Sequence, residues 1–346
     1  AAPLIIGVLY KFNIRRRSKT ELDNKVESHA KKTGTPVMGG LIVLVPVLVL
    51  NLFFNFSSEV ALLLAVLFLG GLLGAVDDLF NVFGHEGVSE AFRRGVTPLV
   101  TSSDITWSIY KLILLPWEAF KEAFRVMGSY RGGFKAHEKV LLQCLLAGGA
   151  AYYLYANLGQ TFFWLPLLGK FNLGLFYPLI VVFLMVGYAN AFSITDGLDG
   201  LSGGTHALAF LALGVVTLTL GKPDLSLFAA SLVGAELAFL YFNIYPARVE
   251  MSDVGTLPLG MIFALLAVLL GREFVLPVIG AVFTAEVLSS FLQVWSVKLR
   301  GRRIFKIAPF HHHLEAVGWG ETKVVMRMWL AGALFALAGI LLGVLY

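Results

Sequence analysis

Repeated apolar runs of about 20 residues constrain this chain more than any other feature. A transmembrane helix needs about 20 consecutive apolar residues to cross the hydrocarbon core of a bilayer. Hydrophobic residues make up 58% of the 346 residues and charged residues 14%, whereas a soluble domain is about 25% charged. The sequence therefore predicts an all-α, polytopic transmembrane helix bundle with ten spans. These lie near residues 1–12, 37–56, 58–76, 139–157, 173–192, 203–220, 225–243, 255–271, 274–297 and 325–345.

The predicted spans belong to a single domain over residues 1–346. About ten apolar residues precede Lys11, too few to cross a bilayer, so we expect the first helix to be truncated in this sequence. Residues 84–133 form an insertion between two spans, in which apolar and aromatic residues are interrupted by charges. This pattern favours an amphipathic helix that lies in the cytoplasmic membrane interface.

Lysine and arginine residues set the orientation of the predicted spans. Of the 27 basic residues, all but Lys170, Lys222 and Arg272 fall on or next to one side when the spans alternate from a cytoplasmic segment 13–36. Cytoplasmic loops of membrane proteins carry such an excess of basic residues. The membrane thus explains the net charge of +5, and we expect no nucleic-acid partner. The single cysteine, Cys144, excludes an intrachain disulfide and a C-x-x-C metal site.

Acidic and histidine residues gather on this predicted cytoplasmic side. Charges at mid-membrane cost roughly 2.5–3.5 kcal/mol on insertion scales, and unrelated structural charges would scatter over both faces. Mg²⁺ prefers oxygen ligands and is typically held by one or two carboxylates together with substrate phosphates. The pattern therefore indicates a cytoplasmic active-site cleft for phosphoryl transfer. Its candidate residues are Asp77, Asp78, Asp196, Asp199, Asp253 and His311, His312 and His313, accompanied by Lys32 and Thr35.

Each of these motifs also has a purely structural interpretation. The pair Asp77-Asp78 is compatible with a solvated helix end, and Asp196 or Asp199 with an N-cap of the following helix. Asp253 suits the first turn of a helix, where a carboxylate faces the positive end of the helix dipole. Three adjacent histidines point in different directions and cannot easily share one zinc ion, which favours contact with phosphate or an orienting role.

Several motifs in this order resemble the polyprenyl-phosphate N-acetylhexosamine-1-phosphate transferases. The resemblance runs from about residue 3 to the end of the chain, except for residues 84–133. Its most specific string is Pro-Phe-His-His-His-Leu-Glu at residues 309–315, which points to the muramoyl branch of that superfamily. The other matching stretches are 28–40, 76–78, 190–200, 242–243 and 253–255.

The resemblance implies roles for individual residues. Asp77, Asp78, Asp253 and His311, His312 and His313 match the essential catalytic positions, and Asp253 matches the metal ligand. The family usually has Asn where Ser193 stands, so we expect this position to lose an amide that could contact substrate. The residues expected to bind substrate are Lys32, Thr35, Asn190, Asp196, Asp199 and Asn243, with Asp199 at the expected nucleotide pocket.

The resemblance also implies a reaction, a cofactor and partners. UDP-N-acetylmuramoyl-pentapeptide and undecaprenyl phosphate would give lipid I and UMP, with Mg²⁺ as the cofactor. The protein would lie in the bacterial plasma membrane among its lipids, with its active site at the cytoplasmic face, commonly as a homodimer. A phosphate monoester has its second pKa near 6, so direct attack by the lipid phosphate is favoured over a covalent intermediate on an aspartate.

Other classes of function stay open at this point. A sister transferase that uses UDP-N-acetylglucosamine shares most of the motifs, but the histidine string argues against it. An ion-coupled transporter would line a pathway at mid-membrane with its carboxylates, whereas these carboxylates are predicted at one face. A non-catalytic membrane scaffold would not need so many acidic residues on one side.

Overall fold

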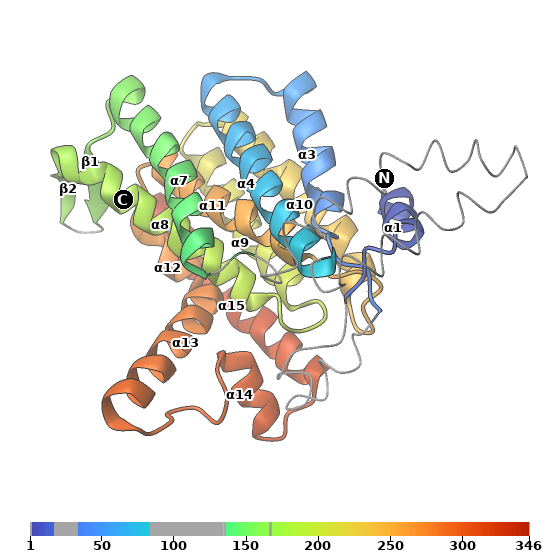
Figure 1. The fold of residues 1–346 in the computed structure, drawn as a ribbon. Coiled ribbons are helices and arrows are strands. Elements are labelled where there is room, and N and C mark those ends of the chain that lie inside the picture. Colours follow the sequence, from blue (N-terminus) through green and yellow to red (C-terminus); the bar gives the residue numbers. More distant parts are fainter. Residues whose placement is uncertain (1, 17–33, 84–133, 135, 166–167, 346) are drawn as a thin grey trace, which may run out of the picture.

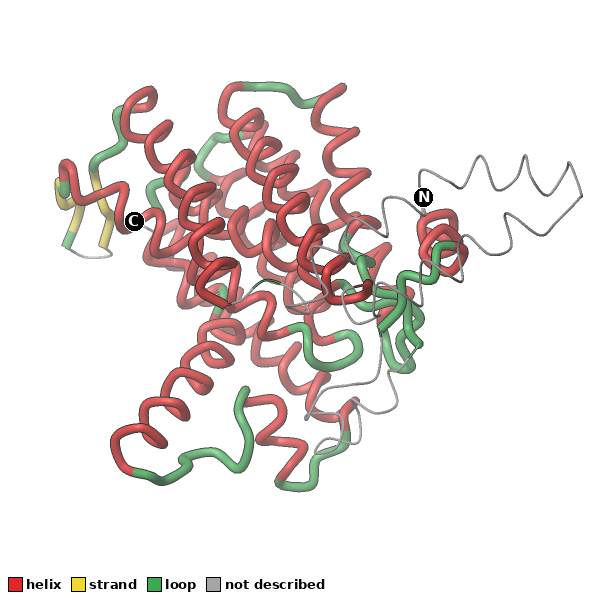
Figure 2. The backbone as a smooth tube through the Cα atoms, in the orientation of Figure 1, coloured by secondary structure: helices red, strands yellow, loops and turns green. Residues whose placement is uncertain are grey.

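The computed structural model describes residues 2–16, 34–83, 134, 136–165 and 168–345. Figure 1 shows long helices that stand side by side as one bundle, with α13 and α14 leaning out from one end. Figure 2 shows that helices make up most of the described backbone. They are α1 (Ala2–Lys11), α3 (Leu41–Phe54), α4 (Ser58–Phe83), α7 (Ala136–Leu158), α8 (Tyr177–Thr195), α9 (Leu201–Thr219), α10 (Pro223–Asn243), α11 (Ser252–Leu269), α12 (Leu276–Ile279), α13 (Ala281–Arg300), α14 (Phe310–Ala316) and α15 (Glu321–Leu345).

These helices confirm an all-α, polytopic membrane protein. A helix, or the bent pair of α12 and α13, lies at each of the ten apolar runs. By length and composition, six of the described helices can cross a membrane, or seven when the bent pair counts as one span. Helices α1 and α3 are apolar but shorter. The number of ten spans and the truncated first helix therefore stay predictions, and the insertion 84–133 lies outside the described residues.

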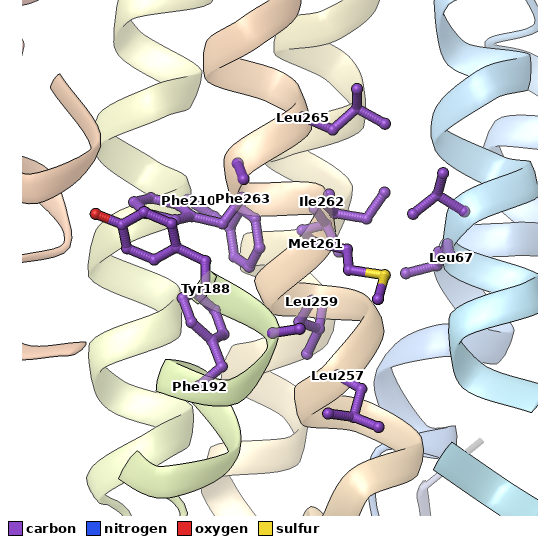
Figure 3. Packing of buried hydrophobic residues seen from close by; sticks show 14 of the residues in the cluster. Leu67, Tyr188, Phe192, Phe210, Leu257, Leu259, Met261, Ile262, Phe263 and Leu265 are labelled. Carbon is purple, nitrogen blue, oxygen red and sulfur yellow. The ribbon is translucent and has the colours of Figure 1, made fainter. Parts of the chain in front are cut away.

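Helix α11 forms the centre of the bundle. Every residue from Val254 to Leu269 is buried, and the helix packs most extensively against α4 and α8. A helix that is apolar all round must be covered on every side. Because neighbours fix α11 along its length, its first turn is held rigidly at one end of the bundle. Figure 3 shows its side chains reaching both flanks, with Phe263 beside Tyr188, Phe192 and Phe210, and Met261 facing Leu67 on α4.

Two helix boundaries differ from those expected from the apolar runs. Helix α4 does not end at the aspartate pair but continues to Phe83, so Asp77 and Asp78 lie inside a helix, only 3% and 7% exposed. The interpretation of this pair as a solvated helix end is therefore wrong. Helix α7 begins at Ala136, before its apolar run, and Glu138 in its first turn suits the helix dipole. Both extensions place charged side chains on ordered helices.

The run at 274–297 is bent rather than straight. A short arm containing η2 (Glu273–Val275) and α12 meets α13 at an angle of 82°. Helix α13 then leads away from the bundle toward α14 (Figure 1). Between α7 and α8 lies an antiparallel hairpin of β1 (Phe162–Leu165) and β2 (Gly169–Asn172), which the apolar pattern did not predict.

Candidate active site

Three aspartates and one lysine meet where α4, α7 and α11 come together. Asp77 and Asp78 lie on α4, Asp253 on the first turn of α11 and Lys139 on the first turn of α7. The Lys139 Nζ atom lies 3.1 Å from Asp77 Oδ2 and also donates to Asp253 Oδ2. Asp78 Oδ2 accepts a 3.0 Å hydrogen bond from the Val254 N–H. The structure thus brings together the three aspartates predicted to be catalytic.

The close approach of α4 to α11 depends on a glycine. A Cβ atom at Gly74 would overlap the backbone carbonyl oxygen of Asp253. Gly74 therefore lets the backbone of α4 touch the first turn of α11, which places Asp77 and Asp78 beside Asp253. Ser252, just before Asp253, has a φ of 61°, a value that favours glycine.

We expected Ser193 to lose a contact that the family's asparagine amide could make at this position. Its hydroxyl makes a contact of its own, with Asp253. Its Oγ donates to Asp253 Oδ1 at 2.7 Å, while Lys139 occupies Oδ2 of the same carboxylate. Both oxygens of Asp253 are therefore engaged by donors from different helices, α8 and α7. This fixes the plane of the carboxylate, and Ser193 holds a predicted catalytic residue in place.

The stretch 190–200 joins the remaining predicted residues to this centre. Asp196 accepts hydrogen bonds from Ser202 Oγ at 2.6 Å and from the Ser252 N–H at 3.0 Å. Asp199 Oδ2 accepts from the Ala247 N–H at 2.9 Å, and its own N–H donates to Glu321 Oε1. Both aspartates therefore hold loop backbone around the site.

Two asparagines tie the same stretch to neighbouring elements. Asn190 Nδ2 donates to Gln143 Oε1 at 2.7 Å, one turn along α7 from Lys139. Asn243 bridges two loops, since its Oδ1 accepts from the Gly200 N–H and its Nδ2 donates to the Val249 carbonyl. Asn190 thus faces α7 near the aspartate cluster, whereas Asn243 uses both ends of its amide to order the backbone. Their substrate-binding roles stay predictions.

The three adjacent histidines have three different environments. His311 is buried between α13 and the stretch 190–200, with Nδ1 3.0 Å from Glu286 Oε2. His312 Nδ1 lies 2.7 Å from Glu315 Oε2; burial lowers the pKa of His312, and the Glu315 carboxylate opposes that shift. His313 Nδ1 accepts from the Lys306 N–H at 3.2 Å. The different orientations agree with the expectation that they do not share one ion.

The predicted residues at the N-terminal side are only partly described. Lys32 lies outside the described residues. The Thr35 carbonyl accepts a hydrogen bond from the Arg16 N–H, and the following segment runs beside the turn before Asp253. There the Pro36 carbonyl accepts from the Glu250 N–H at 2.9 Å, and Gly40 N–H donates to the Met251 carbonyl at 3.0 Å. Thr35 is thus placed near the Asp253 turn, and its contact with substrate stays a prediction.

The aspartate cluster suits a divalent cation together with a phosphorylated substrate. In the described part of the chain, no group of three or more His, Cys, Asp or Glu side chains is arranged to hold a metal ion. Mg²⁺, however, usually takes only one or two protein carboxylates, and substrate phosphates and waters complete its shell. Asp77 and Asp253 both direct an oxygen at the ammonium of Lys139, so they converge on a position that stabilises positive charge. Asp253 as a Mg²⁺ ligand fits this donor set.

Sequence reasoning missed Lys139 and Glu286. Lys139 was counted among the basic residues that orient the membrane spans, and its sequence neighbours do not mark it as special. Glu286 did carry a signal, because an acidic residue inside an apolar run usually has a functional partner. The structure gives Glu286 that partner in His311.

Comparison with known proteins agrees with this geometry. Residues 131–271 match the family model described as glycosyl transferase family 4. The chain is 36% identical to a phospho-N-acetylmuramoyl-pentapeptide-transferase of Bacillus mycoides (strain KBAB4), over 99% of this chain and 93% of the relative. The chain belongs to the phospho-N-acetylmuramoyl-pentapeptide-transferase family. The chain is also 36% identical to proteins of the same name from Oceanobacillus iheyensis and Geobacillus sp. (strain WCH70), over 98% of this chain and 92% of each relative.

Proposed function

We propose that this chain transfers phospho-N-acetylmuramoyl-pentapeptide from its UDP donor to undecaprenyl phosphate, giving lipid I and UMP. The observation that carries the proposal is the cluster of Asp77, Asp78 and Asp253 around Lys139 in a chain of this family. The 36% identity over 99% of the chain favours this reaction over transfer from UDP-N-acetylglucosamine. The histidine string at 309–315 supports the same choice.

The reaction is a displacement at phosphorus. An oxygen of undecaprenyl phosphate forms a bond to the β-phosphorus of the donor, and the bond from that phosphorus to the bridging oxygen breaks. The bridging oxygen leaves with UMP. The attacking monoester is largely dianionic at pH 7, because its second pKa is near 6, so it needs no residue to remove a proton. The protein has mainly to position the two substrates and to balance their charge.

The residues around Asp253 are suited to these tasks. Bound Mg²⁺, held by Asp253 and the substrate phosphates, would neutralise charge on the transferring group. Lys139 supplies a fixed positive charge between Asp77 and Asp253. Ser193 and Lys139 together fix both oxygens of Asp253. Asp77 and Asp78 act near the lipid phosphate or the metal, and His311, His312 and His313 near the diphosphate or the sugar.

The membrane arrangement belongs to the same proposal. Ten spans follow when α1, α3, α7 and the bent pair are added to the six long apolar helices. The excess of basic residues on one side favours an active site at the cytoplasmic face of the bacterial plasma membrane. We also propose a homodimer, which chemical cross-linking of the purified protein in nanodiscs would test.

Release of UMP by the purified protein tests the function. We expect release to require undecaprenyl phosphate and Mg²⁺, and to occur with UDP-N-acetylmuramoyl-pentapeptide but not with UDP-N-acetylglucosamine. The Asp253→Ala variant should lose at least about 100-fold in kcat, the scale of losing one electrostatic group of a transition state. Asp224→Asn is the matched control, because Asp224 is exposed in the first turn of α10, at the end opposite Asn243.

Three results would contradict the proposal. Release of UMP from UDP-N-acetylglucosamine alone would assign the chain to the sister transferases. Near-normal turnover of Asp253→Ala with Mg²⁺ would remove Asp253 from the site. A phosphorylated aspartate trapped during turnover would replace direct attack with a covalent route.

A further inference from the structure

The buried carboxylate of Glu286 on α13 accepts hydrogen bonds from His311, the first of the three histidines. Glu286 is fully buried, and both of its oxygens accept hydrogen bonds from His311. Oε1 accepts from the backbone N–H at 3.1 Å, and Oε2 lies 3.0 Å from the side-chain Nδ1. A carboxylate has only acceptors, so Nδ1 must carry a hydrogen. Glu286 therefore fixes the position of His311, and it engages Nδ1 so that Nε2 is the ring nitrogen left for another partner.

The other ring nitrogen of His311 faces the stretch 190–200. His311 is 1% exposed, and its Nε2 atom has no hydrogen-bond partner among the described residues. A Cβ atom at Gly197 would overlap this nitrogen. Gly197 lies between Asp196 and Asp199, two of the predicted substrate-binding residues of that stretch. A buried polar atom without a partner is costly, and here it is aimed at the wall of the candidate site.

We propose that Glu286 is a positioning residue for the transfer reaction, holding His311 so that Nε2 serves the diphosphate of the UDP donor. This inference rests on the proposed function. A diphosphate offers only acceptors, so Nε2 must also carry a hydrogen when it binds one. The ring then bears a positive charge, and the Glu286 carboxylate carries the compensating negative charge. Orientation of an imidazole by a carboxylate at its far nitrogen is the arrangement that serves catalytic histidines in other enzymes.

The neighbouring histidines single out His311 for this role. His313 uses Nδ1 as an acceptor toward the Lys306 backbone and packs its ring on Phe305, with centroids 5.4 Å apart, which suits the ordering of its own loop. His312 pairs with Glu315 on the same short helix, three residues away. Only the Glu286 contact joins a histidine of this string to a transmembrane helix among the ion pairs of the described residues.

The chemistry of glutamine makes the inference testable. In Glu286→Gln, an amide nitrogen takes the place of one carboxylate oxygen, so a second donor lies against one of the two His311 donors, at a position 3.0–3.1 Å away. The variant also lacks the compensating charge. We expect kcat/KM for the UDP donor to fall by about 10–100-fold, the range known for removing the hydrogen-bond partner of a metal-binding histidine. The KM for undecaprenyl phosphate should stay within about twofold, because Glu286 acts on the donor side.

A double-mutant comparison separates positioning from general support of the fold. His311→Asn should lose more activity than Glu286→Gln, and Glu286→Gln/His311→Asn should be within about twofold of His311→Asn alone, since coupled residues are not additive. Glu286→Asp keeps the charge and should recover several-fold over the glutamine variant. Ser290→Ala is the matched control, because Ser290 Oγ donates to the Glu286 backbone carbonyl at 3.2 Å and not to its carboxylate in the described part of the chain. Its rate should be unchanged.

The outcomes are distinguishable from failure of the proposed function. Wild-type protein that releases no UMP from either UDP-sugar would reject the function itself. If the wild type is active, a Glu286→Gln variant with more than half of its kcat/KM overturns the inference. So does a double variant whose losses multiply, or a parallel rise in both KM values with a lowered Tm, which would indicate only structural support. If the glutamine variant is too unstable to purify, Glu286→Asp is compared with wild type instead. Unchanged kcat/KM in Glu286→Asp then supports the inference if His311→Asn is inactive. It refutes the inference if His311→Asn is active.

Discussion

Removing Lys139 should destabilise the protein before substrate is added. Its ammonium lies between Asp77 and Asp253, with Asp78 close by on the same turn of α4. The side chains of Lys139, Asp77 and Asp253 are 18%, 4% and 15% exposed. Little water can therefore solvate the two carboxylates once the ammonium is removed. In Lys139→Met, three carboxylates would face one another without a counter-charge.

The magnitude follows from the distance and the burial. Two unit charges 3.1 Å apart interact by about 5 kcal/mol at an effective dielectric constant of ~20. The net value is lower, because the charges also lost hydration when the site was formed. Breaking a buried pair by removing one partner typically costs about 3–5 kcal/mol. The residual exposure of Lys139 favours the lower end, so we expect a loss of about 3 kcal/mol.

Thermal unfolding in detergent, with UMP release in parallel, measures this effect. Lys139→Met should have a Tm several degrees lower than wild type, and added Mg²⁺ should raise its Tm more than that of wild type. Lys222→Met is the matched control, because Lys222 pairs with Glu59 at 2.9 Å but is 45% exposed, and exposed pairs contribute about 0–1 kcal/mol. Equal Tm values for the two methionine variants would refute the argument that Lys139 balances the aspartates.

Two further predictions concern packing and pH. Gly74→Ala should lower both Tm and the rate of UMP release, by about 1–3 kcal/mol in stability, because its Cβ would overlap the Asp253 carbonyl; in Gly148→Ala the new Cβ meets no atom within 4 Å, so that variant should be neutral or more stable. Burial lowers the pKa of His312 against the opposing effect of Glu315, so the unfolded chain binds this proton first, and stability should fall as pH drops below about 6.5. Thermal unfolding at pH 7.5 and 5.5 should show a smaller drop in Tm for His312→Asn than for wild type, and equal drops would contradict it.

The helices could be predicted from sequence because membrane insertion imposes a length rule on each span separately. That rule depends on the bilayer around a helix and not on the residues that the helix packs against. It therefore located the apolar runs but not the ends of α4 and α7. The aspartate pair was expected to end a helix, because charged side chains usually stop an apolar run. In the fold, Lys139 and the Val254 N–H compensate these charges, and α4 continues beyond them to Phe83.

The residues of the site could be named in part for a different reason. Carboxylates beside glycines at the end of an apolar run are unusual enough to be noticed without their neighbours. Lys139 has no such local signal, because lysines are common at the cytoplasmic ends of membrane helices. Its role depends on contacts with residues 62 and 114 positions away in the sequence, and no local pattern encodes such a distance.

The stretch 190–200 shows how local structure turns a motif into the hub of a site. Asn190 and Ser193 are three residues apart on α8 and so share a face, which meets Gln143 on α7 and Asp253 on α11. The helix ends at Thr195, and beyond it the chain no longer repeats one face. Successive residues therefore reach different neighbours: Asp196 the Ser252 N–H, Gly197 the ring of His311, and Asp199 the Ala247 N–H. A helix continued through this stretch would present only one side, so the glycine-rich break is what lets a single segment contact α7, α11, the loop at Ala247 and His311.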